Sequence, residues 1–363
     1  MMRSPDRESP DRPNRSRILV IRAGALGDTL MATPVITALA RRHPGARIDF
    51  LASEGAAPLV AGHRQLGDVL TLRQRNVPYA ISLEKRRLVR QLQRNRYDLA
   101  VVLEHAPTYY ELAERGRAQA VSGFRTTPFD PSLHSMANNL RAAGFAEWRR
   151  ESLEMLVAPP DDAAQEAAVA LTRAAPGPLV GLHMGYGPSH RKRNQEQRLR
   201  GWAVENFVVV ARWLAASGAT IVLTGAREDR PGVDRLAALL PPERVLDVAG
   251  RTSIPTLVAL LARLRLLVSV DSGPAHIAAA LGTPLVVLWG PGILEQTRPI
   301  STKGPVAVVR EPVACAPCYG TPLMKTCQRN VCMERITPER VLEAIRNVAG
   351  GLLADAPLRA VAR

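Results

Sequence analysis

The feature that most constrains the fold is a short apolar run that leads directly into a glycine-containing turn. Ile18–Ile21 is uninterruptedly aliphatic, and the turn RAGALGD, which ends at Asp28, follows without a break. Such a run is typical of a strand buried inside a parallel sheet. Beyond Asp28, apolar residues recur at helical spacing as far as Leu39, and Pro34 is expected to kink this helix or delay its regular part. The order strand, turn and helix predicts the first unit of a doubly wound α/β domain.

The same order recurs along the chain and predicts a second domain. Further strands are expected at 47–52, 100–103, 179–183, 220–223, 266–270 and 285–289, and helices at 202–216, 257–264, up to 281 and from 337 onward. A stretch rich in proline and glycine separates the two series, as in an interdomain connection. The predicted organisation is a disordered basic tail at 1–16, domains at 17–158 and 179–336, a linker at 159–178, and a C-terminal helix and tail at 337–363.

Two doubly wound domains in succession predict a ligand cleft between them, at the carboxyl ends of their strands. The longest uncharged stretch, 272–294, is interrupted by prolines and glycines, so it is not expected to span a membrane. The N-terminal residues lack the apolar segment of a secretory signal. We therefore expect a cytoplasmic protein.

The first candidate site is the turn that contains Gly24, Gly27 and Asp28. Its glycines allow a tight turn and a close approach to a ligand, and Asp28 starts a helix that faces the predicted cleft. Asp28 could serve chemistry or only cap its helix. The spacing matches neither the G-x-G-x-x-G fingerprint of dinucleotide-binding proteins nor a phosphate-binding P-loop, which disfavours a nicotinamide oxidoreductase.

The second candidate site is DSGPAH, from Asp271 to His276, between an apolar strand and an alanine-rich helix. Backbone N–H groups at a helix start, the Ser272 hydroxyl and the flexibility of Gly273 suit a diphosphate. Asp271 could accept hydrogen bonds from sugar hydroxyls or cap the helix. His276 is expected to pack or cap and is not assigned proton transfer.

Positive charge dominates the composition. Lys and Arg total 48 against 33 Asp and Glu, a net charge of +15, which favours polyanionic partners such as nucleic acid, acidic lipid or phosphorylated sugars. A basic loop at 190–193 continues to Arg198 and Arg200, ahead of Trp202, and either neutralises phosphate over the cleft or is a solvated surface. No nucleic-acid-binding module is recognisable, and 4% aromatic residues offer few stacking platforms. Nucleic acid is therefore not the expected partner.

All four cysteines lie close together late in the chain, at Cys315, Cys318, Cys327 and Cys332. In a cytoplasmic protein two spaced pairs favour a structural zinc site over disulfides. Four reduced thiols without metal are the alternative, and the sequence does not choose between them.

Two strings carry a specific resemblance. The segment from Ile18 to Ala52, ILVIRAGALGDTLMATPVITALARRHPGARIDFLA, and the segment from Val270 to Pro291, VDSGPAHIAAALGTPLVVLWGP, closely resemble the two signatures of the heptosyltransferase family, glycosyltransferase family 9. The resemblance covers Arg17 to about Val348. It implies a GT-B fold of two facing Rossmann-like domains and an inverting transfer from a nucleotide sugar without a catalytic metal or other cofactor. The implied donor is ADP-L-glycero-β-D-manno-heptose and the implied acceptor the lipopolysaccharide inner core.

The resemblance also assigns expected roles to residues of the donor site. It places the catalytic base on Asp28, the donor-phosphate turn on Ser272 and Gly273, and the family's histidine on His276. Asp271 would lie near the sugar hydroxyls. The family's phosphate-binding lysine corresponds to Arg200 here, and either Glu228 or Asp229 would meet the ribose.

The acceptor side is expected in the first domain. Arg22, Gly27 and Arg125 are the predicted acceptor-binding residues, and Arg86 and Arg87 are further candidates for acidic or phosphorylated sugars or for a solvated surface. A lipid-linked acidic acceptor and a basic enzyme together imply peripheral contact with the inner membrane. The alternative within the family is transfer of another sugar, or transfer to another cell-surface glycan.

Overall fold

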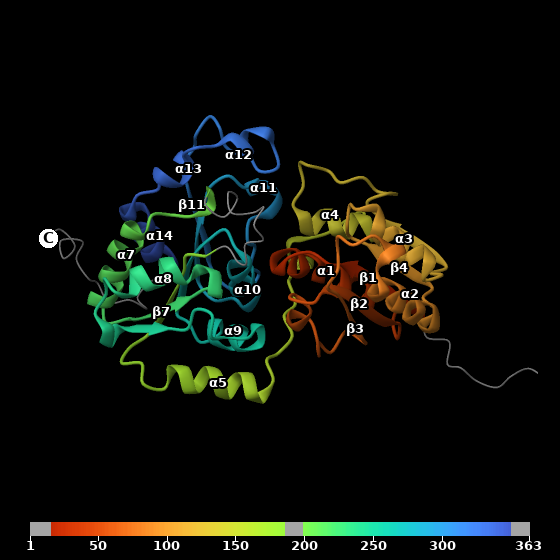
Figure 1. The fold of residues 1–363 in the computed structure, drawn as a ribbon, viewed down its shortest axis with the longest axis horizontal. Coiled ribbons are helices and arrows are strands. Elements are labelled where there is room, and N and C mark those ends of the chain that lie inside the picture. The colour runs from red at the N-terminus through yellow and green to blue at the C-terminus, as the bar shows by residue number, and fades with distance from the viewer. Residues whose placement is uncertain (1–15, 186–198, 350–363) are drawn as a thin grey trace, which may run out of the picture.

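The computed structural model describes residues 16–185 and 199–349, which form two α/β halves, each built around a parallel sheet (Figure 1). The strand order is β3-β2-β1-β4-β5 in the first sheet and β11-β10-β9-β6-β7-β8 in the second. The predicted tail at 1–16, apart from Ser16, and the basic loop at 190–193 with Arg198 lie outside the described residues. The predicted fold class, two Rossmann-like doubly wound domains, is confirmed.

The first sheet consists of β1 Arg17–Arg22, β2 Arg47–Ser53, β3 Val69–Leu72, β4 Leu99–Val102 and β5 Ala120–Gly123. All neighbours pair in parallel, so the carboxyl ends of the strands share one edge. The three central strands match the predicted apolar runs. The outer strands β3 and β5 were not predicted because each is four residues long and partly exposed, which removes the continuous apolar signal.

Four helices cover this sheet: α1 Leu26–Arg42, α2 Leu83–Asn95, α3 Pro107–Arg115 and α4 Ser135–Ala142. Helices α1 and α4 pack on the face toward the second half, whereas α2 and α3 pack on the opposite face (Figure 1). Helix α1 begins two residues earlier than predicted and continues through Pro34. The carbonyl of Leu30, left without the N–H that proline lacks, accepts a hydrogen bond from the Thr33 hydroxyl at 2.7 Å instead.

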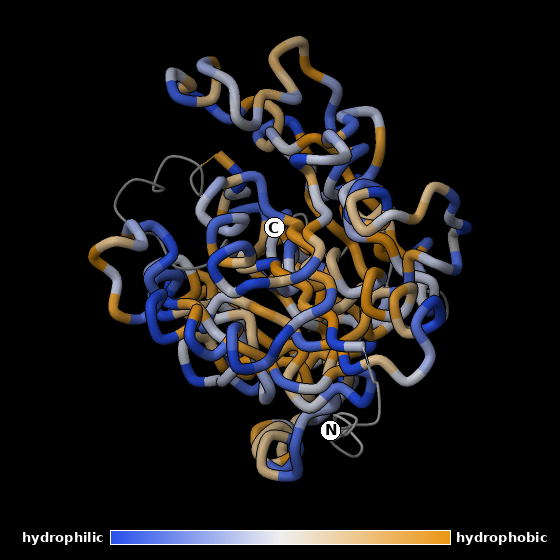
Figure 2. Tube along the Cα trace, turned by 90° about the vertical axis from the view of Figure 1, so that its right-hand side faces the viewer, coloured by the Kyte–Doolittle hydropathy of each residue, from blue (hydrophilic) through white to orange (hydrophobic). Residues whose placement is uncertain are grey.

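The second sheet consists of β6 Leu179–His183, β7 Thr220–Thr224, β8 Val245–Asp247, β9 Leu266–Val270, β10 Leu285–Trp289 and β11 Val306–Arg310. Its helices are α7 Val204–Ala216, α8 Arg230–Ala237, α9 Ile254–Leu261, α10 Gly273–Leu281, α11 Leu294–Thr297, α12 Pro322–Thr326, α13 Val331–Glu334 and α14 Pro338–Ala349. The sheet strands are apolar and lie inside the molecule, while the outer segments are mostly hydrophilic (Figure 2).

The predicted linker contains a helix. Helix α5 Asp162–Thr172 lies along α9 of the second half, where Arg263 Nε donates a hydrogen bond to Thr172 Oγ1 at 3.3 Å (Figure 1). At the other end of the connection, the N–H of Ala158 bonds the carbonyl of Leu59 in the first half at 2.7 Å. Among the described residues, none of the helices is both long enough and apolar enough to cross a bilayer.

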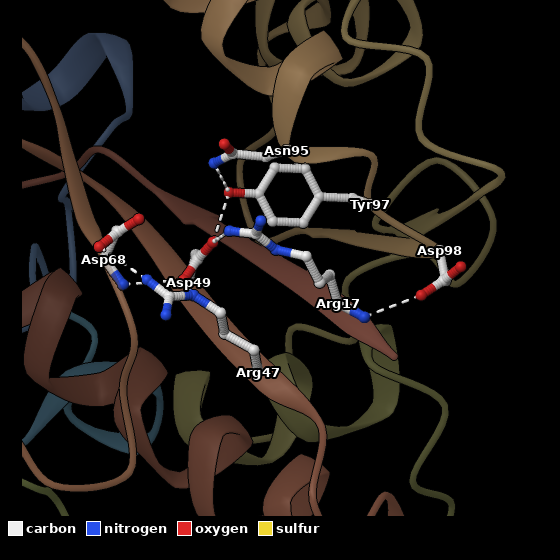
Figure 3. Close-up of polar contacts among 7 residues, drawn as sticks. All are labelled: Arg17, Arg47, Asp49, Asp68, Asn95, Tyr97 and Asp98. Carbon is white, nitrogen blue, oxygen red and sulfur yellow. Dashed lines mark hydrogen bonds and ion pairs between the residues drawn. The ribbon is translucent and has the colours of Figure 1, made fainter. Parts of the chain in front are cut away.

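A buried carboxylate organises the amino edge of the first sheet, opposite the edge where the strands end (Figure 3). Asp49 is fully buried and accepts hydrogen bonds from Arg17 Nη2 at 2.8 Å, Tyr97 Oη at 2.7 Å and Arg47 Nε at 3.1 Å. The N–H of Asp68 adds a fourth bond at 2.8 Å. Because Arg17, Tyr97 and Asp68 come from three other segments, this cluster ties the starts of β1 and β2 to the segments before β3 and β4.

Candidate active site

Helices α1 and α10 begin against one another, at the meeting point of the two halves (Figure 1). A Cβ added to Gly27 would lie 2.7 Å from Cδ2 of His276, and one added to Gly273 would lie 2.9 Å from Cβ of Leu26. Such distances are too short for carbon atoms, so both glycines are required for this approach. The contact brings the two predicted site turns, which are separated by more than half of the chain, to one place.

Asp28 is the third residue of α1 and retains partial access to solvent. Its Oδ1 accepts a hydrogen bond from Arg22 Nη2 at 2.9 Å, and its Oδ2 accepts one from the N–H of Ala25 at 3.1 Å. Burial raises the pKa of Asp28, but the Arg22 charge and these hydrogen bonds outweigh it, and the pKa is lowered overall. The side chain, 38% exposed, is thus an oriented, ionised carboxylate that also satisfies one N–H at the helix start.

Arg22 is held between two carboxylates at the carboxyl edge of the first sheet. Its Nη1 donates a hydrogen bond to the carbonyl of Leu103 and lies 3.8 Å from Glu104 Oε2. Burial raises the pKa of Glu104, and the charge of Arg22 opposes this effect. Glu104 Oε1 is buried without a hydrogen-bond partner among the described residues. Arg22, a predicted acceptor-binding residue, therefore contacts Asp28 directly, and its guanidinium orients the carboxylate.

Asp271 directly follows β9 and forms an ion pair with Arg200, which lies two residues before Trp202. Arg200 Nη1 lies 2.5 Å from Asp271 Oδ2, and both side chains are less than 10% exposed. Burial raises the pKa of Asp271, Arg200 lowers it, and Asp28 raises it further, which indicates that the two carboxylates share one electrostatic environment. The structure thus brings together Asp28, Asp271 and Arg200, which the sequence analysis had grouped by resemblance alone.

The first turn of α10 carries the predicted diphosphate turn. Ser272, rather than Asp271, occupies the N-cap position, and its hydroxyl bonds Ser269 Oγ at 2.9 Å instead of a helix N–H. His276 is buried one turn later, where burial lowers its pKa to about 4. The imidazole is therefore neutral at neutral pH and packs against Gly27, and the donor-binding role implied for His276 by the resemblance stays a prediction.

The two acidic residues after β7 lie in different environments. Asp229 turns inward and accepts a hydrogen bond from the N–H of Ala226 at 2.7 Å. Burial raises the pKa of Asp229. A Cβ on Gly185 would lie 2.1 Å from this carboxylate, so Asp229 fills the space beside the end of β6. Glu228 is exposed in the same short 3₁₀ turn, Arg227–Asp229. Of these two residues, Glu228 is the more exposed.

The remaining predicted acceptor arginines do not join this cluster. Arg125 is exposed, pairs with Glu114 Oε1 at 2.6 Å, and lies over the ring of Tyr110 with its guanidinium carbon 4.2 Å from the ring centre. Arg86 and Arg87 lie on α2, which covers the sheet face turned away from the second half. The acceptor-binding roles predicted for these three arginines therefore stay predictions.

The structure shows no disulfide bond among the four cysteines. Cys318 and Cys332 are buried, Cys315 is exposed, and Cys327 Sγ donates to the carbonyl of Arg329 at 3.1 Å. Within the part of the chain that the structure describes, no three potential ligand side chains gather to hold a metal ion. The structural zinc site stays a prediction.

Glu104 is a residue of the site that the sequence motifs do not predict, because it lies outside both glycine-containing turns. A signal was present: a carboxylate directly follows the apolar run of β4, and the ends of parallel strands meet at one edge. The neighbouring strand β1 ends at Arg22. The ion pair between Arg22 and Glu104 therefore follows from the position of β1 beside β4 in the sheet.

Comparisons with known proteins show what this chain is similar to. The model of glycosyltransferase family 9 (heptosyltransferase) matches residues 194–326. Lipopolysaccharide heptosyltransferase 2 of Salmonella typhimurium is 26% identical over 324 residues, which cover 80% of this chain and 87% of that protein. The chain therefore matches the model of glycosyltransferase family 9 in its second half and is similar over most of its length to lipopolysaccharide heptosyltransferases. The predicted resemblance to this family is thereby confirmed, and the protein is a glycosyltransferase.

Solved structures of family members share the architecture. ADP-heptose lps heptosyltransferase II of E. coli superposes with a TM-score of 0.72 at 22% identity, covering 92% of this chain and 98% of that chain. The family 9 enzyme of Veillonella parvula DSM 2008 gives a TM-score of 0.77 at 18% identity, covering 94% and 99%. The fold is therefore GT-B, with the candidate active site at the meeting point of its two domains.

Proposed function

We propose that this glycosyltransferase moves heptose from ADP-L-glycero-β-D-manno-heptose to the lipopolysaccharide inner core, with inversion at the anomeric carbon and without a catalytic metal. The names of the relatives support the sugar, the nucleotide and the acceptor class. The observation that carries the chemistry is Asp28, an oriented and partly exposed carboxylate held by Arg22 beside the first turn of α10. A single displacement fits this arrangement.

In that displacement, an acceptor hydroxyl attacks the anomeric carbon from the face opposite the diphosphate. The new carbon–oxygen bond forms as the anomeric carbon–oxygen bond to the diphosphate breaks, and the electron pair of that bond leaves with ADP. Asp28 accepts the hydroxyl proton as the attack proceeds. Because the pKa of Asp28 is lowered, the carboxylate is ionised at neutral pH and available for the proton.

The donor site would be built on the second domain. Backbone N–H groups at the start of α10 and the residues Ser272 and Gly273 would face the diphosphate, where the helix dipole stabilises the charge that develops on the leaving group. Arg200 would add positive charge there while it orients Asp271, whose carboxylate would accept sugar hydroxyls. Glu228, the exposed acid of its pair, is the better candidate for the ribose hydroxyls.

The acceptor would approach from the first domain. A lipid-linked, acidic inner core matches the net charge of +15, and the enzyme would work at the inner face of the cytoplasmic membrane. Arg125 lies on that domain, and its exposed guanidinium could exchange Glu114 for an acidic sugar.

Calorimetric titration tests the donor assignment. ADP-heptose, ADP, UDP and GDP are titrated into the purified protein with and without EDTA, and heptose transfer to a purified inner-core acceptor is then followed under the same conditions. We expect ADP-heptose and ADP to bind, UDP and GDP not to bind, and EDTA to change neither binding nor transfer. Preference for UDP or GDP would leave the fold assignment unchanged and would show that the donor is a different nucleotide sugar. Loss of transfer in EDTA would contradict the metal-independent step.

A further inference from the structure

Helix α2 carries a surface that the proposed reaction does not use. Leu83, Arg87, Arg90 and Arg94 are exposed and are separated by four, three and four positions, so they form one stripe along the helix. Ile81, just before the helix, extends this stripe at its first end. We call these five residues the α2 surface.

The opposite face of α2 explains why this stripe points outward. Lys85, Leu88, Val89 and Leu92 are buried against the sheet. The amine of Lys85 donates hydrogen bonds to the carbonyls of Arg75 and Val77 and to Thr108, which fix the start of the helix. The α2 surface therefore has a fixed orientation on the domain.

The α2 surface combines aliphatic exposure with uncompensated positive charge. Ile81 and Leu83 are 73% and 65% exposed, among the most exposed large apolar residues in the described chain. In residues 16–185 and 199–349, no carboxylate forms an ion pair with Arg87, Arg90 or Arg94. Toward the second end of the helix, an open hollow is lined by Arg90, Gln93, Arg94 and Arg96. Arginines in a hollow suit phosphate groups, which they bind by two parallel N–H bonds.

The position of the α2 surface relates it to the candidate base. The segment before α2 follows β3, so it lies at the carboxyl edge of the first sheet. Arg75 Nη1 in this segment donates to the carbonyl of Ala23 at 2.7 Å, one residue before the glycine turn of Asp28. The aliphatic end of the α2 surface and the candidate base are thus attached to the same edge of the domain.

We propose that the α2 surface docks the protein on a bilayer that contains anionic lipids. Ile81 and Leu83 enter the headgroup region, and Arg87, Arg90 and Arg94 contact lipid phosphates. The two aliphatic side chains favour lipid over nucleic acid, because they offer neither a stacking platform nor a phosphate contact. The proposal rests on the proposed function in one respect: a lipid-linked acceptor gives the enzyme a reason to lie on the membrane with this edge toward it.

Flotation of the full-length protein with vesicles tests the proposal without any transfer reaction. One set of vesicles contains equal amounts of phosphatidylcholine and phosphatidylglycerol, and the other contains phosphatidylcholine alone; neither contains a glycolipid. The wild-type protein is expected to bind the first set in a salt-sensitive manner and not the second. Replacing Arg87, Arg90 and Arg94 by Ala should weaken binding about a hundredfold, since each basic residue near an anionic surface contributes about fivefold.

Two further variants distinguish a contribution of the α2 surface to vesicle binding from an effect of the total charge of the protein. Ile81→Ser with Leu83→Ser should weaken vesicle binding about tenfold while its salt sensitivity remains. Arg173→Ala with Arg265→Ala and Arg335→Ala removes the same charge from exposed positions elsewhere and should bind vesicles within about threefold of wild type. Circular dichroism verifies that each variant is folded, and transfer to a water-soluble acceptor fragment should be unchanged in the Ile81 and Leu83 double variant and in the control variant.

The results decide between the docking surface and its alternatives. Equal binding by the α2 arginine variant and the wild type, or equal loss in the control variant, overturns the proposal. If the α2 arginine variant lost binding to a DNA duplex while its vesicle binding was unchanged, the partner would be nucleic acid. This result would also overturn the proposal. If vesicle binding follows the expectation but no heptose is transferred to any acceptor, the proposed function fails and the docking surface stands.

Discussion

Arg22 Nη2 lies 2.9 Å from Asp28 Oδ1, and this pair joins the end of β1 to the first turn of α1. The same guanidinium faces Glu104 at 3.8 Å, so one arginine serves two carboxylates of unlike exposure. Asp28, the more exposed of the two, is the candidate base. Glu104, the more buried, competes with Asp28 for the positive charge of Arg22. We therefore expect charge sharing at this edge to tune the pKa of the candidate base.

Opposite shifts in the pH profile test this charge sharing. Arg22→Gln removes the charge that lowers the pKa of Asp28, so the acid limb of kcat/KM should move to higher pH. Glu104→Gln removes the competing negative charge, so the acid limb should move to lower pH, with KM for the donor unchanged. The profiles are measured by heptose transfer over a pH series, with thermal unfolding as the control for folding. Identical acid limbs in wild type and both variants would exclude this coupling.

Close approach of α1 and α10 predicts a large effect of one methyl group. Gly27→Ala places a Cβ against the buried His276 ring and should lower kcat on the order of a hundredfold, because the two turns of the site are pushed apart. Gly55→Ala is the matched control, since its Cβ meets nothing within 4 Å, and its rate should equal that of wild type. Unchanged turnover in the Gly27 variant would show that the interdomain distance is not critical.

Buried histidines predict a loss of stability in mild acid. Burial lowers the pKa of His183 and of His276 to about 4 each, below the ordinary 6.5. The unfolded chain therefore binds protons more readily between pH 6.5 and 4, and the free energy of unfolding falls as the pH decreases through this window, on the order of 3 kcal/mol per histidine. Urea unfolding at a series of pH values measures the slope. His183→Asn should flatten it, and an unchanged slope in that variant would contradict the assignment.

The Asp49 cluster predicts a stability effect that is separate from catalysis (Figure 3). Asp49→Asn leaves Arg17 and Arg47 without their buried partner and should cost about 3 kcal/mol in the free energy of unfolding. Asp68→Asn is the control, because its pair with Arg47 is half exposed and contributes less than about 1 kcal/mol. Donor affinity should be the same in both variants. Equal stability of the two would refute a structural role for the buried carboxylate.

The central strands and the two turns could be predicted from local sequence because both signals are local. Strands such as β1 and β9 are buried on both faces, which leaves continuous apolar runs, and the turns that lead to Asp28 and Asp271 directly follow them. The edge strand β3, by contrast, is short and partly exposed, and its sequence carries no comparable signal.

The partners within the site could not be predicted in the same way. Arg200 and Asp271 are 71 positions apart, and Arg22 and Glu104 meet only because β1 and β4 are neighbours in the sheet. No local spacing encodes such pairs. The distinction between Glu228 and Asp229 likewise depends on which side chain turns toward Gly185, a contact that the sequence alone does not reveal.

The most direct test of the account compares Asp28→Asn with the wild-type protein by donor calorimetry and by heptose transfer under the same conditions. Because asparagine keeps the shape of the side chain but cannot accept the proton, transfer should fall on the order of a thousandfold while the affinity for ADP-heptose stays within about twofold. Transfer at the wild-type rate would contradict the assignment of Asp28 as the general base.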